Sequence, residues 1–328
     1  MVKLNKNNTI NVLDIGARYG IYPSWKNFSG KANYHLIEAD KTEARRLKKK
    51  YKKFKNIFIY NKALGKDHDN LYFKVLHNPA MSSFLERRNI SPFYWGGGRK
   101  VQKQIKSVKK MKTISLNTFI RKNNLKADFL KLDVEGFEYT ILSYGLNIFN
   151  NLLGARSEVN FCNIFKLDKK KTGTFSLIHE IFSNHDFILL NIDYQGKGDY
   201  FHKFLSSDQR CGVLQSTDAV WIKDPKIIVK KFNEIQVIKI LVFLILNNGI
   251  DLAMWILEST FKKFSNFRKN KNNRNFIFIK NEVCKHLYNL KWTPNQKIKE
   301  HKNYYEKIFN ESYPEMNKFN EMKDFNPY

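Results

Sequence analysis

The chain has 328 residues, of which 42% are hydrophobic, and a formal net charge of +28. This hydrophobic content excludes an intrinsically disordered protein, and the length predicts about two domains with a sizeable core. The three cysteines lie far apart in the sequence, which excludes a disulfide framework and a cysteine-based metal site. Because the first residues contain no apolar segment of a secretory signal, we expect a reducing, cytoplasmic location.

Strands and helices alternate over the first 225 residues. Apolar runs predict strands at 10–16, 34–38, 56–61, 129–133, 154–161, 187–192 and 218–222. Helices are predicted at 41–53, 115–124 and 175–184, an added β element at 71–76, and a cation-rich loop at 86–112. This alternation indicates an α/β fold with a mostly parallel sheet flanked by helices. No helix separates the last two strands, so we expect them to pair antiparallel.

After Asp224-Pro225 the alternation stops, and helices are predicted near 227–246, 250–265, 276–290 and 296–310. We therefore expect two domains, 1–225 and a helical extension at 226–328. Within the extension, residues 237–246 are strongly apolar but too few to span a bilayer. A buried helix is the simpler interpretation of this segment, and a membrane-surface or dimer helix is the alternative.

The strand at 10–16 ends in a turn with the spacing Asp14-x-Gly16-x-x-x-Gly20, which we expect to open a helix. A dinucleotide fingerprint would have a second glycine where Arg18 stands, so a pyrophosphate at this turn is disfavoured. The turn suits a cofactor with a zwitterionic amino-acid tail, such as S-adenosylmethionine. At the end of the next strand, Glu38 can accept both hydroxyl groups of a ribose.

A cluster of charges follows the strand at 129–133, at the sheet edge where open α/β sheets bind ligands. Asp133 is placed near the reactive end of the cofactor, where a carboxylate can orient or deprotonate a hydroxyl acceptor. Lys131 can neutralise the acids or bind substrate, and Glu135 can contact substrate or brace the turn. Glu138 is interpreted as a structural acid at the start of a helix, where it favours the helix dipole.

Taken together, these residues resemble the FkbM-type S-adenosylmethionine-dependent methyltransferases over about residues 10–223. The matching segments are Leu13–Gly20, Leu36–Asp40, Asn61–Gly65, Met81–Leu85, Thr113–Asn117, Phe129–Glu138, Glu158–Phe161 and Ser216–Trp221. The resemblance implies a class I methyltransferase fold, a hydroxyl acceptor often on a sugar or polyketide, and cofactor contacts at Asp14, Gly16, Gly20, Glu38, Ser82 and Ser83. The usual acid of the segment at 113–117 is Asn117 here, so any role of that carboxylate is lost.

The resulting hypothesis is an O-methyltransferase that transfers the methyl group of S-adenosylmethionine to a hydroxyl of a carbohydrate or glycan precursor. Asp133, Lys131 and Glu135 are its candidate catalytic residues, and Glu158 and Arg18 are candidate substrate residues. The histidines show no ligand spacing, so no metal is expected, although magnesium bound by Asp133 and Glu135 is left open.

Two alternative interpretations of the sequence assign the protein a different function. The first is a nucleic-acid methyltransferase that uses the cationic loop at 86–112; the second is a non-catalytic glycan-assembly or membrane-surface adaptor with a vestigial cofactor fold. The basic residues are spread along the chain without a nucleic-acid recognition motif, so we do not expect nucleic acid as a partner. Peripheral membrane contact, through the basic surface or the helix at 237–246, stays open.

Overall fold

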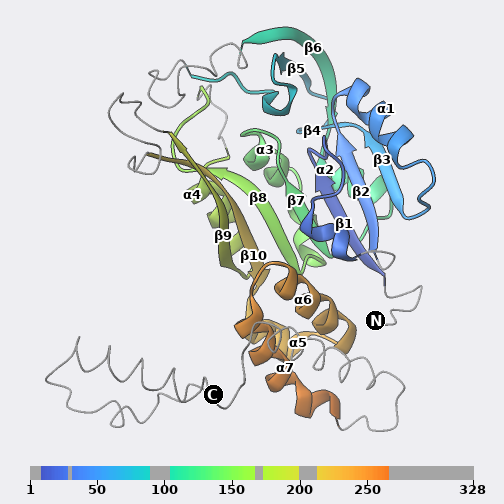
Figure 1. Ribbon diagram of the computed structural model, residues 1–328, viewed down its shortest axis with the longest axis vertical. Helices are drawn as coiled ribbons and strands as arrows, with labels where there is room; N and C mark the ends of the chain where they lie inside the picture. The colour runs from blue at the N-terminus through green and yellow to red at the C-terminus, as the bar shows by residue number, and fades with distance from the viewer. Residues whose placement is uncertain (1–8, 29–31, 89–103, 167–172, 199–212, 266–328) are drawn as a thin grey trace, which may run out of the picture. The chain divides into compact units, whose positions relative to one another are not determined.

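The central sheet of the protein has seven strands in the order β3-β2-β1-β7-β8-β10-β9 (Figure 1). The computed structural model describes residues 9–28, 32–88, 104–166, 173–198 and 213–265. The strands are β1 (Ile10–Ile15), β2 (Ala32–Glu38), β3 (Ile57–Asn61), β7 (Phe129–Leu132), β8 (Gly154–Asn160), β9 (Phe187–Gly198) and β10 (Val213–Lys223). Neighbours are parallel except at β10, which is antiparallel to β8 and β9. The predicted mostly parallel sheet is therefore confirmed, and its last two strands pair antiparallel as expected.

Helices cover the sheet and complete its core. They are α1 (Lys41–Lys50), α2 (Leu116–Lys122), α3 (Glu138–Ser143), α4 (Phe175–Ser183) and the short 3-10 helices η2 (Ser24–Phe28), η3 (Pro79–Met81) and η7 (Leu146–Asn150). Helix α1 packs on β2 and β3, and α4 packs on β8 and β9. The fully buried Trp221 of β10 stacks on Phe182 of α4 with ring centroids 4.5 Å apart. Large aromatic side chains therefore fix α4 against the half of the sheet that contains β10.

A second, three-stranded sheet has the order β4-β6-β5 and consists of β4 (Ala63–Leu64), β5 (Asn70–Leu76) and β6 (Ile105–Ile114). Strand β6 pairs antiparallel with β5, so the loop predicted at 86–112 is wrong for its last part. The sequence concealed this strand because its apolar residues recur at every third position and do not alternate: Ile105, Val108, Met111 and Ile114. Residues 89–103 lie outside the described part.

The helices after residue 224 are α5 (Pro225–Lys231), α6 (Glu234–Leu246) and α7 (Ile250–Ser265). The single helix predicted at 227–246 is wrong, because Asn233 starts a new helix there. Its side chain accepts the Gln236 N–H at 3.0 Å, and the Gln236 side chain accepts the Asn233 N–H at 3.1 Å. This reciprocal capping box favours a helix start. The helices predicted at 276–290 and 296–310 lie outside the described residues.

Helix α6 is anchored to the beginning of β7 by a buried ion pair. The ammonium of Lys239 lies 2.9 and 2.7 Å from the two carboxylate oxygens of Asp128, and it donates to the carbonyl of Thr9 at 3.0 Å. Phe243 stacks on Phe129 with centroids 4.6 Å apart. Most of the apolar segment at 237–246 is buried in this packing, as the buried-helix interpretation predicts.

Helices α5–α7 belong to the same compact unit as the sheet. The boundary near residue 225 therefore marks the change from alternating elements to helices alone, and its meaning as a domain boundary stays a prediction. Among the described helices, none is long and apolar enough to cross a membrane.

Candidate active site

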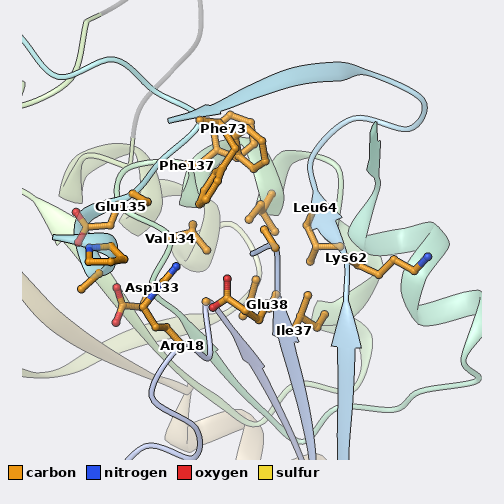
Figure 2. Close-up of a pocket in the computed structure, with 18 residues that line it drawn as sticks. Arg18, Ile37, Glu38, Lys62, Leu64, Phe73, Asp133, Val134, Glu135 and Phe137 are labelled. Atoms are coloured by element: carbon orange, nitrogen blue, oxygen red, sulfur yellow. The ribbon is translucent and has the colours of Figure 1, made fainter. Parts of the chain in front are cut away.

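A pocket opens at the carboxyl ends of β1, β2 and β7, the edge at which the sequence predicts ligand binding (Figure 2). It encloses about 560 Å³, open solvent at its mouth included. Its polar lining residues are Arg18, Glu38, Lys62, Ser82, Asp133 and Glu135. Most of the remaining wall is apolar, with Ile37, Leu64, Phe73, Val134 and Phe137 shown in Figure 2.

The glycine turn brings the ends of three strands together. Gly16 has φ +86°, and a Cβ atom there would lie 1.8 Å from the carbonyl oxygen of Asp133. The N–H groups of Gly16 and Ala17 both donate to the carbonyl of Ile37, at 3.0 and 3.1 Å. Only glycine allows this close approach with a positive φ, so Gly16 sets how near β7 lies to the turn.

The helix expected after this turn is wrong. The chain continues in turns, and the 3-10 helix η2 starts only at Ser24. The N–H groups of Arg18 and Gly20 donate within the turn, to Gly16 and Ala17 carbonyls at 2.9 and 2.8 Å. The turn therefore offers no row of free helix N–H groups to an anion, and recognition in this pocket depends on side chains.

Two residues predicted to contact the cofactor, Asp14 and Gly20, do not line the pocket. Asp14 is buried beneath it, with a carboxylate oxygen 3.8 Å from the Lys131 ammonium, and burial raises the pKa of Asp14 to about 6. Gly20 packs against the hydroxyl of Tyr51, which a Cβ atom would approach to 2.2 Å. Both residues support the turn from outside the cavity.

Glu38 lies at the end of β2 and is only 4% exposed, yet its carboxylate lines the pocket. Its Oε1 atom accepts the Asp40 N–H at 2.8 Å. Burial raises the pKa of Glu38 to about 7, while that hydrogen bond and the charge of Arg18 act in the opposite direction. Asp40 itself caps α1 and pairs with Lys109 at 3.0 Å. Glu38 is therefore an orientated, buried carboxylate that can accept hydrogen bonds from a ligand in the pocket.

Lys131 and Asp133 come from the end of β7 and form a pair. The Lys131 ammonium donates to Asp133 Oδ2 at 3.0 Å. Burial lowers the pKa of Lys131, but the carboxylates of Asp133 and Asp14 outweigh burial and raise its pKa above the usual value. The lysine is buried, whereas the side chain of Asp133 is 43% exposed. Asp133 is thus the member of the pair that a substrate in the pocket can reach.

Glu135 is held in the pocket wall by two contacts from the segment after η3. Its Oε2 atom lies 2.5 Å from an Arg87 guanidinium nitrogen, and its carbonyl accepts the Ser83 hydroxyl at 2.7 Å. Burial raises the pKa of Glu135 to about 7 although Arg87 lowers it. Ser82 lines the pocket, but Ser83 does not, because its hydroxyl braces Glu135 instead. Arg87 is a site residue that the sequence did not reveal; the only nearby signal was the pair Ser82-Ser83.

Glu138 is structural, as interpreted, but by a different means. It is completely buried, and its Oε1 atom accepts the N–H groups of Val134 and Gly136 at 2.9 and 3.3 Å. Burial raises the pKa of Glu138 to about 8. The side chain therefore closes the loop between β7 and α3, and favouring the helix dipole is secondary.

Glu158 is on β8, outside the pocket lining, opposite Asp218 of β10 in the strand register. Burial, with the charges of Glu135 and Asp133, raises its pKa well above the usual value. Beside it, Arg156 contacts Asp218 at 3.0 and 3.2 Å and lies 4.4 Å above the Tyr22 ring. Like Arg87, Arg156 carried no sequence signal. The described residues hold no cluster of three or more metal-ligating side chains.

Asn117, which replaces the expected acid, is remote from this chemistry. Its side-chain oxygen accepts the Asn147 N–H at 3.0 Å and so links α2 to η7. Neither residue lines the pocket. The departure at this position therefore affects a helix contact and leaves the pocket unchanged.

The family described as methyltransferase FkbM domain matches residues 14–198, more than half of the chain. None of the curated proteins matches. Similar solved structures include precorrin-6y C5,15-methyltransferase from Geobacter metallireducens, with 10% identity, 66% of this chain and 80% of that chain covered, and a TM-score of 0.32. TrmK of M. capricolum, in complex with S-adenosylhomocysteine, has 14% identity, 85% and 89% coverage, and a TM-score of 0.31.

Proposed function

The chain belongs to the FkbM methyltransferase family, and from this premise we propose that it methylates a hydroxyl group of a carbohydrate or glycan precursor. It is an S-adenosylmethionine-dependent methyltransferase, and its fold is the class I methyltransferase fold expected from the sequence. The hydroxyl acceptor, its carbohydrate nature and a cytoplasmic location are the proposed parts.

The pocket at the ends of β1, β2 and β7 suits S-adenosylmethionine, which supplies an electrophilic methyl group when bound. Glu38 places a buried carboxylate at the end of β2, where it can accept ribose hydroxyls. The close approach of Gly16 to the Asp133 carbonyl brings the ends of β1 and β7 together at the pocket. The apolar wall that includes Leu64 and Phe73 provides a surface for a flat aromatic base.

The exposed carboxylate of Asp133 at the pocket is the observation that supports a hydroxyl acceptor. Its carboxylate is at the pocket edge, substantially exposed, and fixed by Lys131 through one oxygen. Methyl transfer by in-line displacement depends mainly on positioning the nucleophile. A hydroxyl must also lose its proton, and a carboxylate within hydrogen-bond reach can receive it. Lys131 holds this carboxylate directly, and Glu135 lies beside it in the pocket wall, where Arg87 fixes it.

The charges beside Asp133 favour an uncharged acceptor over nucleic acid. The cations on this side of the site, Lys131, Arg87 and Arg156, already contact carboxylates. Burial keeps Glu158 largely protonated. A phosphate backbone therefore meets cations that are already paired, whereas neutral hydroxyl groups find hydrogen-bond acceptors. The exposed lysines of β6 are the feature that favours nucleic acid. Binding of a duplex or tRNA that weakens steeply with salt would support that alternative, and its absence would dismiss it.

The experiment is transfer of labelled methyl from S-adenosylmethionine to a panel of glycans, with Asp133→Asn beside the wild type. We expect wild-type methylation of at least one glycan, and a loss of turnover of about a hundredfold or more in the variant. Binding of S-adenosylhomocysteine, measured by calorimetry, should be unchanged. Asp251→Asn replaces an exposed acid on α7 and is the matched control.

Undiminished turnover in Asp133→Asn would remove the assignment of this carboxylate as the base. No binding of S-adenosylhomocysteine by the wild type would contradict the cofactor site itself.

A further inference from the structure

A groove at the end of β8 is the strongest feature outside the cofactor pocket. It is formed by residues 160–163, where β8 ends, and by residues 174–177, where α4 begins, and we call it the β8 groove. None of these residues is charged, although the chain carries a net charge of +28. Its lining consists of aromatic, amide, hydroxyl and thiol side chains and one leucine, Leu177. Such a surface suits a neutral ligand with both an apolar face and several polar groups.

An aromatic side chain forms the apolar part of this groove. Phe161 is 36% exposed, and its ring centroid lies 5.3 Å from that of Phe175. Phe175 in turn stacks on His179 at 5.4 Å, and the His179 Nδ1 atom accepts the Trp221 indole N–H at 3.2 Å. Because Trp221 is fully buried, this row of rings ties the exposed phenylalanine to the core. A ligand that stacks on Phe161 therefore meets a surface that is already fixed.

Three polar side chains of the groove form no hydrogen bond within the described part of the protein. The amides of Asn160 and Asn163 and the hydroxyl of Ser176 have no side-chain hydrogen bond to another described residue. Asn160 is only 4% exposed, so its backbone and position are fixed while its amide lines the groove. Hydroxyl groups of a ligand can donate to and accept from all three side chains.

The β8 groove is connected directly to the loop that carries Asp133. The Asn160 N–H donates to the Gly173 carbonyl at 3.0 Å, and the Gly173 N–H donates to the Gly136 carbonyl at 2.8 Å. Phe165 fills the space above Gly136, where a Cβ atom would lie 2.3 Å from its ring. Strand β8 is also the parallel neighbour of β7, whose end bears Asp133. The groove therefore has a fixed position next to the proposed acceptor side.

We propose that the β8 groove binds a pyranose ring of the acceptor, with the C–H face of the sugar on Phe161 and its hydroxyls on Asn160, Asn163 and Ser176. The proposal rests on the proposed function, because it assigns the sugar to the same methyl transfer. It adds the residues that select the acceptor. Replacement of Phe161 then acts on acceptor binding and leaves cofactor binding intact.

Cys162 provides a reporter inside the groove. The full-length protein, saturated with S-adenosylhomocysteine, is alkylated with iodoacetamide in the presence and absence of a panel of methyl glycosides. Mass spectrometry of the peptides separates Cys162 from Cys211 and Cys284. We expect at least one glycoside to slow alkylation of Cys162, and Phe161→Ala to raise the glycoside concentration needed by about tenfold. Phe58→Ala removes a 40% exposed phenylalanine from edge strand β3 and is the matched control.

The same glycosides are tested as methyl acceptors, which separates this proposal from the proposed function. Protection of Cys162 without methylation supports the groove and refutes the methyl transfer to sugar. Methylation without protection supports the transfer and overturns the groove. If neither occurs, both proposals fail. Equal protection in wild type and Phe161→Ala also overturns the groove, provided that both bind S-adenosylhomocysteine equally.

Discussion

Replacement of Glu38 by glutamine tests the cofactor site, because it changes charge but hardly changes shape. The glutamine oxygen can still accept the Asp40 N–H that Glu38 Oε1 accepts at 2.8 Å. What is lost is the ionic character of the bonds to the ribose hydroxyls. A hydrogen bond to an ionised group contributes about 1.5–3 kcal/mol. We therefore expect S-adenosylhomocysteine to bind Glu38→Gln about tenfold to a hundredfold more weakly.

The dependence on pH gives a sharper result. The pKa of Glu38 is raised to about 7 by burial, so at pH 6 most molecules carry a protonated Glu38. If only the ionised form binds well, wild-type affinity rises about tenfold between pH 6 and pH 8. Glu38→Gln should show no such rise. Calorimetry at several pH values measures both, with Glu258→Gln, an exposed acid on α7, as the control.

The same substitution should stabilise the ligand-free protein. The folded-state pKa of about 7 exceeds the usual 4.5, so the folded protein binds more protons than the unfolded chain between these values. The contribution of Glu38 to stability therefore falls as pH rises through this window. At pH 8 the deficit is at most about 3 kcal/mol, and urea unfolding should show Glu38→Gln to be more stable. If Glu38→Gln binds S-adenosylhomocysteine as the wild type does at every pH, the assignment of Glu38 to the ribose is refuted. If its free energy of unfolding at pH 8 equals that of the wild type, the raised pKa of a buried Glu38 carboxylate is refuted.

Two further substitutions test the frame around the site. Gly16→Ala places a Cβ atom 1.8 Å from the Asp133 carbonyl oxygen at a φ of +86°. We therefore expect the free energy of unfolding, measured with urea, to fall by about 3 kcal/mol or more, and S-adenosylhomocysteine to bind more weakly. Wild-type stability and binding would contradict the close approach of Gly16 to Asp133. Lys239→Met leaves the mostly buried carboxylate of Asp128 without its ammonium partner, with only the Asn11 N–H still donating to it, and the free energy of unfolding should fall by about 3–5 kcal/mol. The double variant with Asp128→Asn should recover part of that loss, and no recovery would show that the ion pair is not the cause.

The candidate site was predictable where its residues follow directly from a local pattern. Gly16, Glu38 and Asp133 each end an apolar strand, and parallel strands bring their carboxyl ends to one edge. The sequence could not reveal that Asp14 and Gly20 stay outside the pocket. Their placement depends on Lys131 above Asp14 and on Tyr51 beside Gly20, which come from other strands and helices.

Ion-pair partners that lie far apart in the sequence could not be predicted from any local pattern. Arg87 contacts Glu135 across 48 positions, and Lys239 contacts Asp128 across 111. Strand β6 was missed because most of its side chains are exposed on both faces and its apolar residues do not alternate. The helix predicted after the glycine turn does not form. The local pattern indicated a helix start, but the backbone there forms turns whose N–H groups bond to the end of β2.

The sequence by itself determined the alternation of strands and helices, the family, and the three strand ends that meet at the pocket, because these depend on short-range periodicity and on residues next to one another. Only the tertiary structure decided which acids are exposed and which are braced. Asp133 reaches the pocket, Glu138 is closed within its own loop, and Glu135 is held by Arg87. Burial and long-range pairing set these differences, and neither is encoded in the spacing of residues along the chain.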